Sequence, residues 1–129
     1  MISEFTVSAI FNVSPERLYA AWLDSDQHSK MTGSPAQVND QINGDFLAWD
    51  GYISGKNLEL ESGKRILQSW RTVEFSDEEV DSMIEISFAE EASGSKISLR
   101  HWDLPEHGAQ YESGWVESYF NPMQDYFKD

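Results

Sequence analysis

The sequence predicts an α+β fold in which a curved antiparallel sheet wraps around one long C-terminal helix. The middle of the chain consists of short alternating runs separated by turn residues, which is typical of an antiparallel meander. The C-terminal segment instead repeats apolar residues every three or four positions, the period of a helix. With 129 residues and no internal repeat or linker, we expect a single domain over residues 1–129.

The N-terminal part predicts one strand followed by two short helices. Residues 5–13 alternate apolar with polar or small side chains, the period of a half-buried strand. Ser14-Pro15-Glu16 then provides a cap, a proline at the first helical position and an acid in the first turn. The apolar stripe of this helix is Leu18, Ala21 and Trp22. A second short helix is predicted from Asp24 or Ser25 to about residue 31.

Turn residues divide the next part of the chain into a meander. Asn43-Gly44 and Asp50-Gly51 predict hairpin turns, because both central residues of such a turn must tolerate a positive φ. Further turns are predicted at 61–63 and 92–95, and an acidic loop at 76–79. The predicted strands are 45–49, 52–60, 64–71, 82–89 and 96–102.

The last segment predicts a helix over residues 108–127, about 30 Å long, with a broad aromatic face. One stripe of this face is Tyr111, Trp115 and Tyr119, and the adjacent stripe is Val116, Phe120, Met123 and Phe127. Pro122 is expected to kink the helix, because an interior proline removes a backbone donor and clashes with the preceding turn. The bend would let the helix follow a curved sheet.

The composition excludes several classes of partner. The chain carries 23 acidic and 9 basic residues, a formal net charge of -14, and its basic residues form no run. Such a surface repels phosphate, so we expect no nucleic acid and no membrane partner; a basic protein partner remains open. No apolar run approaches a membrane span and no signal peptide is recognisable, so we expect a cytoplasmic protein without membrane insertion. With no cysteine, thiolate chemistry and disulfides are excluded.

Segments along nearly the whole chain resemble a known family. The resemblance is most specific in residues 49–60, 63–66 and 68–71, and it extends to 14–22 and 114–123. These segments resemble the family named for the activator of the ninety-kilodalton heat-shock chaperone's ATPase, the activator-homologue family. The resemblance implies a START-like, birch-pollen-allergen-like helix-grip fold, whose members commonly hold hydrophobic ligands between helix and sheet. It also implies a heat-shock chaperone as a partner, although the eukaryotic activators carry a separate N-terminal chaperone-binding domain for which these residues leave no room.

Few residues suggest catalysis or metal binding. None of His28, His101 and His107 has a partner at the spacing of a helical zinc site. His101 shares the inward parity of its strand, so it is either a hydrogen-bonded core histidine or a polar contact to a ligand. The acidic residues 77–81 lack the spacing of a calcium loop and predict a solvated loop. We therefore assign no catalytic residue, no metal site and no cofactor.

The tryptophans suggest a binding cavity. Trp22, Trp70 and Trp115 lie on predicted inward faces, where they either fill the core or line an amphipathic pocket. Trp102 has the opposite parity to His101 and is expected to be exposed, where it would mark a contact surface. The predicted ligand-binding residues are Met31, Phe46, Ile66, Trp70, Ile86, Phe88, His101, Tyr111, Trp115, Tyr119 and Met123.

Three function classes follow, in this order. The first is a non-enzymatic domain that holds a small hydrophobic or lipid-like ligand between the long helix and the sheet. The second is a stress-response co-chaperone that interacts with a heat-shock chaperone ATPase. The third is a cyclase- or hydratase-like enzyme, which only the analogy of fold supports.

Overall fold

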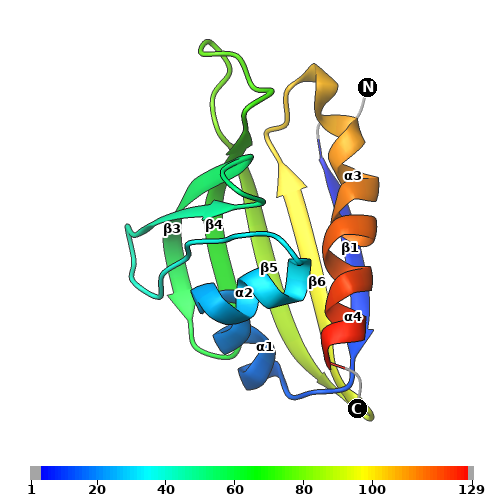
Figure 1. The fold of residues 1–129 in the computed structure, drawn as a ribbon. Helices are drawn as coiled ribbons and strands as arrows, with labels where there is room; N and C mark the ends of the chain where they lie inside the picture. The colour runs from blue at the N-terminus through cyan, green and yellow to red at the C-terminus, as the bar shows by residue number, and fades with distance from the viewer. Residues whose placement is uncertain (1–3, 128–129) are drawn as a thin grey trace.

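The computed structural model describes residues 4–127 and contains a six-stranded antiparallel sheet with helices on one face (Figure 1). Its strands are ordered β1-β6-β5-β4-β3-β2. The strands are β1 (Phe5–Phe11), β2 (Asp45–Ala48), β3 (Ile53–Glu61), β4 (Arg65–Thr72), β5 (Ser82–Glu91) and β6 (Gly94–Trp102). The helical elements are α1 (Pro15–Trp22), α2 (Ser25–Thr32), a 3-10 turn η1 (Glu106–Ala109), α3 (Gln110–Trp115), a π-helical turn η2 (Val116–Phe120) and α4 (Asn121–Phe127). The predicted helix-grip architecture is therefore confirmed.

The two short helices begin where their capping residues predict. The Ser14 hydroxyl accepts a hydrogen bond from the Arg17 backbone N–H at 3.2 Å. The Asp24 carboxylate accepts one from the Gln27 N–H at 2.9 Å. Each cap satisfies a donor that the first helical turn leaves unpaired. Gly33, with φ 79, ends α2 in the left-handed conformation that glycine adopts without strain.

The connection between β2 and β3 is longer than the sequence predicts. Asp50-Gly51 does form the turn, but β2 ends before Trp49 and four residues, 49–52, join the two strands. Trp49, Asp50 and Gly51 all have positive φ values, of 53, 57 and 88. This backbone removes Trp49 from the strand ladder, where the sequence placed it.

Asn43-Gly44 lies at a turn, but the predicted hairpin there is wrong: no named strand lies between α2 and β2, and only an isolated bridge pairs Gln37 with Leu47 across the turn. Instead, the Asn43 N–H donates to the Asn57 carbonyl at 2.8 Å, and the Asn57 N–H donates to the Gly44 carbonyl at 2.9 Å. Asn43 has a positive φ of 68. Gly44 leaves room for the Asn39 side chain, whose Oδ1 would lie 2.0 Å from a Cβ built there. The Asn-Gly and Asp-Gly dipeptides therefore predict the position of a turn, but they do not predict which two segments the turn joins.

The inward faces of the strands follow the predicted alternation. In β4 the buried side chains are Ile66, Gln68, Trp70 and Thr72, and in β6 they are Ser95, Ile97, Leu99 and His101. Trp102 points to the opposite face of the sheet, as predicted. It is half-buried rather than exposed, because the guanidinium of Arg100 lies 4.4 Å above its ring. β5 and β6 are longer than predicted and meet at a two-residue turn, 92–93.

The C-terminal helix contains a π-helical turn just before Pro122. The Asn121 N–H donates to the Val116 carbonyl, five residues back, instead of four. The wider turn gives the proline ring room where a regular helix would press it against a carbonyl, so it takes the place of the predicted simple kink. Val116 departs from the apolar stripe on which the sequence placed it: the residue is 37% exposed, whereas Phe120, Met123 and Phe127 are buried, because the regular helical period is broken by the π-helical turn.

Between the sheet and the helices lies one continuous apolar core. In Figure 1, α1, α2 and the C-terminal helix cover the same face of the sheet, and the long helix runs beside β1 and β6. Within residues 4–127, none of the helices combines the length and the apolar character needed to cross a membrane.

Candidate ligand-binding cavity

A hollow of about 230 Å³ lies between the β2–β3 loop, β3, β4 and the C-terminal helix. Its floor is formed by buried side chains, namely Ile53, Trp70, Tyr111, Trp115 and Tyr119. Its rim is formed by half-buried residues, namely Trp49, Tyr52, Gly114 and Ser118. Six of these nine residues are Trp or Tyr, so the cavity is an aromatic hollow with a few polar atoms.

Trp49 lines the rim and carries a buried polar atom without a partner among the described residues. The positive φ values of residues 49–51 turn the chain so that this side chain reaches the cavity. Its indole nitrogen is buried but has no hydrogen-bond partner among the described residues. A buried N–H without an acceptor costs about 1–3 kcal/mol, so the loop holds this side chain at a cost in stability.

Gly114 opens the rim from the helix side. A Cβ built on this residue would meet no atom within 4 Å, so packing does not require glycine here. Glycine inside a helix costs roughly 0.5–1 kcal/mol relative to alanine. The effect of this residue is thus to leave space at the mouth of the cavity. By contrast, a Cβ on Gly108 would lie 2.7 Å from the Leu104 side chain, so that glycine is required for packing.

The aromatic floor is made of rings that are tilted against one another. The rings of Trp70 and Trp115 lie 5.6 Å apart at 42°, and those of Trp115 and Tyr119 lie 4.9 Å apart, also at 42°. Tyr111 meets Trp70 edge-on, at 4.9 Å and 77°. Because neighbouring rings are not parallel, the walls form a concave surface rather than a flat stack.

A hydrogen bond from Trp115 to His101, on β6, fixes the orientation of the Trp115 ring. The Trp115 indole N–H donates to His101 Nδ1 at 3.0 Å, and an indole nitrogen can only donate. The hydrogen of the imidazole is therefore on Nε2, which donates to Ser82 Oγ at 2.8 Å. Ser82 in turn donates to the Trp70 carbonyl at 2.8 Å. Burial lowers the pKa of His101 to about 3, so the ring stays neutral and both its nitrogens are used inside the core.

His28 fixes Tyr119 in the same way. Its Nδ1 lies 2.8 Å from the Trp22 carbonyl, which can only accept, so Nδ1 carries the hydrogen. The Tyr119 hydroxyl then donates to Nε2, at 2.8 Å. Burial lowers the pKa of His28 and raises that of Tyr119, so both groups remain neutral. Two cavity walls are thus held by buried, uncharged histidines.

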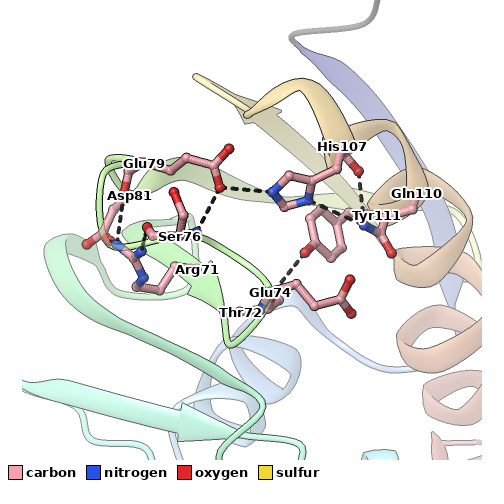
Figure 2. Close-up of polar contacts among 9 residues, drawn as sticks. All are labelled: Arg71, Thr72, Glu74, Ser76, Glu79, Asp81, His107, Gln110 and Tyr111. Carbon is pink, nitrogen blue, oxygen red and sulfur yellow. Dashed lines mark hydrogen bonds and ion pairs between the residues drawn. The ribbon is translucent and has the colours of Figure 1, made fainter.

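A loop at the end of the cavity is fastened to the start of the C-terminal helix (Figure 2). The β4–β5 connection, residues 73–81, contributes Glu79, whose carboxylate lies 3.0 Å from His107 Nε2. The hydrogen bond from His107 is the main cause that lowers the pKa of Glu79. Arg71 bonds Asp81 at 2.6 Å at the base of the same loop. This fastening holds the loop beside the Tyr111 end of the cavity.

The tyrosines of the cavity are hydrogen-bonded beneath this loop. The hydroxyls of Tyr111 and Thr72 are hydrogen-bonded at 2.7 Å, and Figure 2 shows Glu74 beside them. The Tyr52 hydroxyl donates to the Glu74 carboxylate. Burial is the main cause that raises the pKa of both tyrosines, and the negative charge of Glu74 adds to the rise for Tyr111. A carboxylate therefore stands next to the aromatic rim.

The structure brings together only some of the residues that the sequence predicted for a ligand site. The predicted residues that line the cavity are Trp70, Tyr111, Trp115 and Tyr119. The other predicted residues are buried outside its lining: Met31, Phe46, Ile66, Ile86, Phe88, His101 and Met123. The lining residues that the prediction missed are Trp49, Tyr52, Ile53, Gly114 and Ser118. An aromatic residue on each side of Asp50-Gly51, and a glycine within the aromatic helix, were the available signals.

A second hollow lies against β2, β3 and β4. Its volume is about 410 Å³, and Phe46 is one of its lining residues. The lining includes the charged side chains of Asp45, Lys56 and Asp81, and Lys56 is already bonded to Asp45 at 2.9 Å. Because these charges are paired, this hollow offers less to an apolar ligand than the aromatic cavity does. Within residues 4–127, no group of three or more His, Asp or Glu side chains is placed to hold a metal ion.

Comparison with known proteins identifies the family. Residues 12–128 match the family described as "Activator of Hsp90 ATPase homolog 1-like protein". The chain belongs to this family. As a member of the activator-homologue family, it resembles the human "Activator of 90 kDa heat shock protein ATPase homolog 1", with 23% identity over 125 residues. It also resembles homolog 2 of the mouse, with 26% identity over 93 residues.

These relatives are much longer than the chain. The alignment covers 96% of this chain but 37% of the human protein, and 72% of this chain but 28% of the mouse protein. A solved structure agrees over its whole length: "an HSP90 activator from plasmodium falciparum" matches with a TM-score of 0.86 and 20% identity, covering 97% of this chain and 96% of that one. At this identity the match shows the shared helix-grip fold alone.

Proposed function

We propose that this activator-homologue protein binds a small molecule with an apolar or aromatic body in the aromatic cavity. The observation that carries the proposal is the hollow of about 230 Å³ lined by three Trp and three Tyr. The hollow opens to the surface at its half-buried rim, so a ligand could enter it without displacing the core. Drug-sized ligands occupy pockets of about 300–1,000 Å³. The expected ligand is therefore small, or inserts only one end.

Two further features support binding rather than catalysis. The walls are rigid, because Trp115 and Tyr119 are held by His101 and His28, and a rigid site loses little entropy when a ligand binds. The direction of the His101 hydrogen bonds also leaves its Nε2 as a donor to Ser82, so this histidine is not placed to act as a base on that hydroxyl.

The test uses a variant that fills the cavity from the helix side. Gly114→Leu places a side chain into the open space at the rim, where nothing obstructs it. Val116→Leu, on an exposed position of the same helix, is the matched control. We expect small aromatic alcohols and amides to bind the wild type and Val116→Leu by calorimetry, and not to bind Gly114→Leu. Equal binding to all three proteins would place the ligand elsewhere and contradict the proposal.

We propose binding to a heat-shock chaperone as a second function. The family match supports it, and so does the full-length structural match to a protein described as an HSP90 activator. The aromatic cavity does not exclude this role, since a partner would contact the outer surface. Because the chain spans only 28% and 37% of the two curated relatives, the activity of those whole proteins does not transfer directly.

An ATPase assay with the chaperone from the same organism tests this second function. We expect weak binding with little stimulation, because activation requires preferential binding to the active conformation and the longer relatives can gain avidity from a second region. A saturable stimulation of about tenfold at micromolar protein would make the co-chaperone role the leading function.

A further inference from the structure

We propose that the ligand of the aromatic cavity carries an organic cation of the quaternary ammonium type, and that its positive head lies among the aromatic rings. This inference rests on the proposed function and specifies the chemistry of the ligand. Trp and Tyr rings have a negative face, and Trp is the strongest binder of cations among the aromatic side chains. Rigid aromatic cages are the common protein solution for ligands with an ammonium group that cannot donate hydrogen bonds.

The composition of the lining favours a cation over an anion. None of the described residues that line the cavity has a formal charge, and three of them are Trp and three are Tyr. A site for an anionic ligand would need Lys or Arg at this place. The nearby Arg71 packs over the ring of Phe75 and bonds Asp81, so its charge is already balanced.

The electrostatic surroundings are negative. Glu74 accepts a hydrogen bond from Tyr52 at the rim, and Glu74 and Glu79 both act on Tyr111 at the floor, where they add to the effect of burial in raising its pKa. The whole chain has a net charge of -14. A cation is attracted by these charges, while the aromatic walls replace part of its hydration.

The shape and size of the cavity fit such a head group. The rings of Trp70, Trp115, Tyr119 and Tyr111 pack against one another with centroids 4.9–5.6 Å apart, so they form one aromatic wall, while Trp49 and Tyr52 form the rim. At about 30 Å³ for each water-sized group, the cavity of about 230 Å³ holds roughly seven or eight such groups. This volume suits a trimethylammonium head with a short chain, but not a long acyl chain.

The experiment compares two ligands that differ only in charge. Choline and 3,3-dimethyl-1-butanol have the same shape, but the latter has carbon in place of the charged nitrogen. Their affinities for the full chain are measured by two-dimensional NMR titration. The same titrations with Gly114→Leu, which fills the cavity, show whether the ligands bind there. We expect choline to bind at least about fivefold more tightly than the alcohol. Glycerophosphocholine is the third ligand: equal or tighter binding than choline indicates a lipid head group as the source, and weaker binding indicates a free ammonium compound.

Two charge variants distinguish the effect of the Glu74 charge beside the cavity from the effect of the net charge of the whole protein. Glu74→Gln keeps a hydrogen-bond acceptor for Tyr52 but removes the negative charge at the rim. Glu78→Gln removes an exposed charge elsewhere on the same loop. We expect Glu74→Gln to weaken choline about two- to fivefold, to leave the neutral alcohol unchanged, and to affect choline more than Glu78→Gln does.

The outcomes distinguish this inference from the proposed function. Tighter binding of the neutral alcohol than of choline, blocked by Gly114→Leu, would overturn the cation and leave the binding function in place. If neutral aromatic alcohols bind but choline and glycerophosphocholine do not, the cation is likewise overturned and the binding function remains. Failure of every ligand would overturn both.

Discussion

The two ends of the space between the long helix and the sheet are built differently. At the α4 end, Phe120, Met123 and Phe127 are at most 5% exposed. Phe11 of β1 meets the rings of Phe120 and Phe127 at 6.1 and 6.5 Å, so this end is filled. At the α3 end, the same helix and sheet enclose the aromatic cavity.

The difference lies in how the large side chains are held. The filled end is made of apolar side chains that can shift until the space is closed. At the α3 end, Trp115, Tyr119 and Tyr111 each have a hydrogen bond to a buried partner, namely His101, His28 and Thr72. A ring that moved inward to fill the cavity would break such a bond and leave a buried polar group unpaired, at a cost of about 1–3 kcal/mol. Polar anchoring thus keeps one end open.

The largest expected effect is on stability, at the open end. Trp115→Ala should lower the free energy of unfolding by about 3–5 kcal/mol, because it removes a buried aromatic side chain and leaves His101 Nδ1 without its donor. Trp102→Ala, on the outer face, should cost less than about 1 kcal/mol. Urea denaturation measures both changes. Equal losses would show that the inner and outer faces of β6 are not distinguished energetically.

Acid should weaken the open end in particular. Burial lowers the pKa of His101 from 6.5 to about 3, and that of His28 in the same direction, so the unfolded chain takes up protons more readily than the folded chain in this range. The stabilisation is complete above about pH 6.5 and falls as pH decreases, by up to about 1.4 kcal/mol per pH unit for each histidine.

His101→Gln isolates this contribution. Glutamine provides an acceptor for Trp115 and a donor for Ser82 but takes up no proton. Urea denaturation at about pH 7 and about pH 5 should therefore give a smaller loss of stability on acidification for His101→Gln than for the wild type. The same loss in both proteins would mean that His101 does not carry the acid sensitivity.

The smallest effect contrasts two glycines near the start of the long helix. Gly114→Ala should raise the free energy of unfolding by about 0.5–1 kcal/mol, because it improves helix propensity and its Cβ meets no atom. Gly108→Ala should lower it, since its Cβ would press on Leu104. Thermal unfolding of both variants gives the signs. A destabilised Gly114→Ala would show that this position is not open space.

Features that depend on local residues were predictable from the sequence. The caps at Ser14 and Asp24, the inward parity of Trp70 and His101, and the helix-grip order all follow from patterns within a few residues. The rim of the cavity was not predicted, although the aromatic residues beside Asp50-Gly51 were a signal, because Trp49 and Tyr52 reach the cavity from a four-residue loop that lies outside the strands. The exposure of Val116 was missed because a π-helical turn breaks the regular helical period.

We propose that the α3 end of the helix–sheet space binds a ligand and that the rest of the core is structural. The five tryptophans allow one direct measurement, since each indole N–H gives its own signal in a two-dimensional NMR spectrum. On titration with choline, we expect the indole signals of Trp49, Trp70 and Trp115 to shift, because these three tryptophans line the cavity. Trp102, on the outer face, should not shift. Shifts confined to Trp102, or no shift of any indole signal with choline or with small aromatic alcohols, would show that no ligand binds at the α3 end.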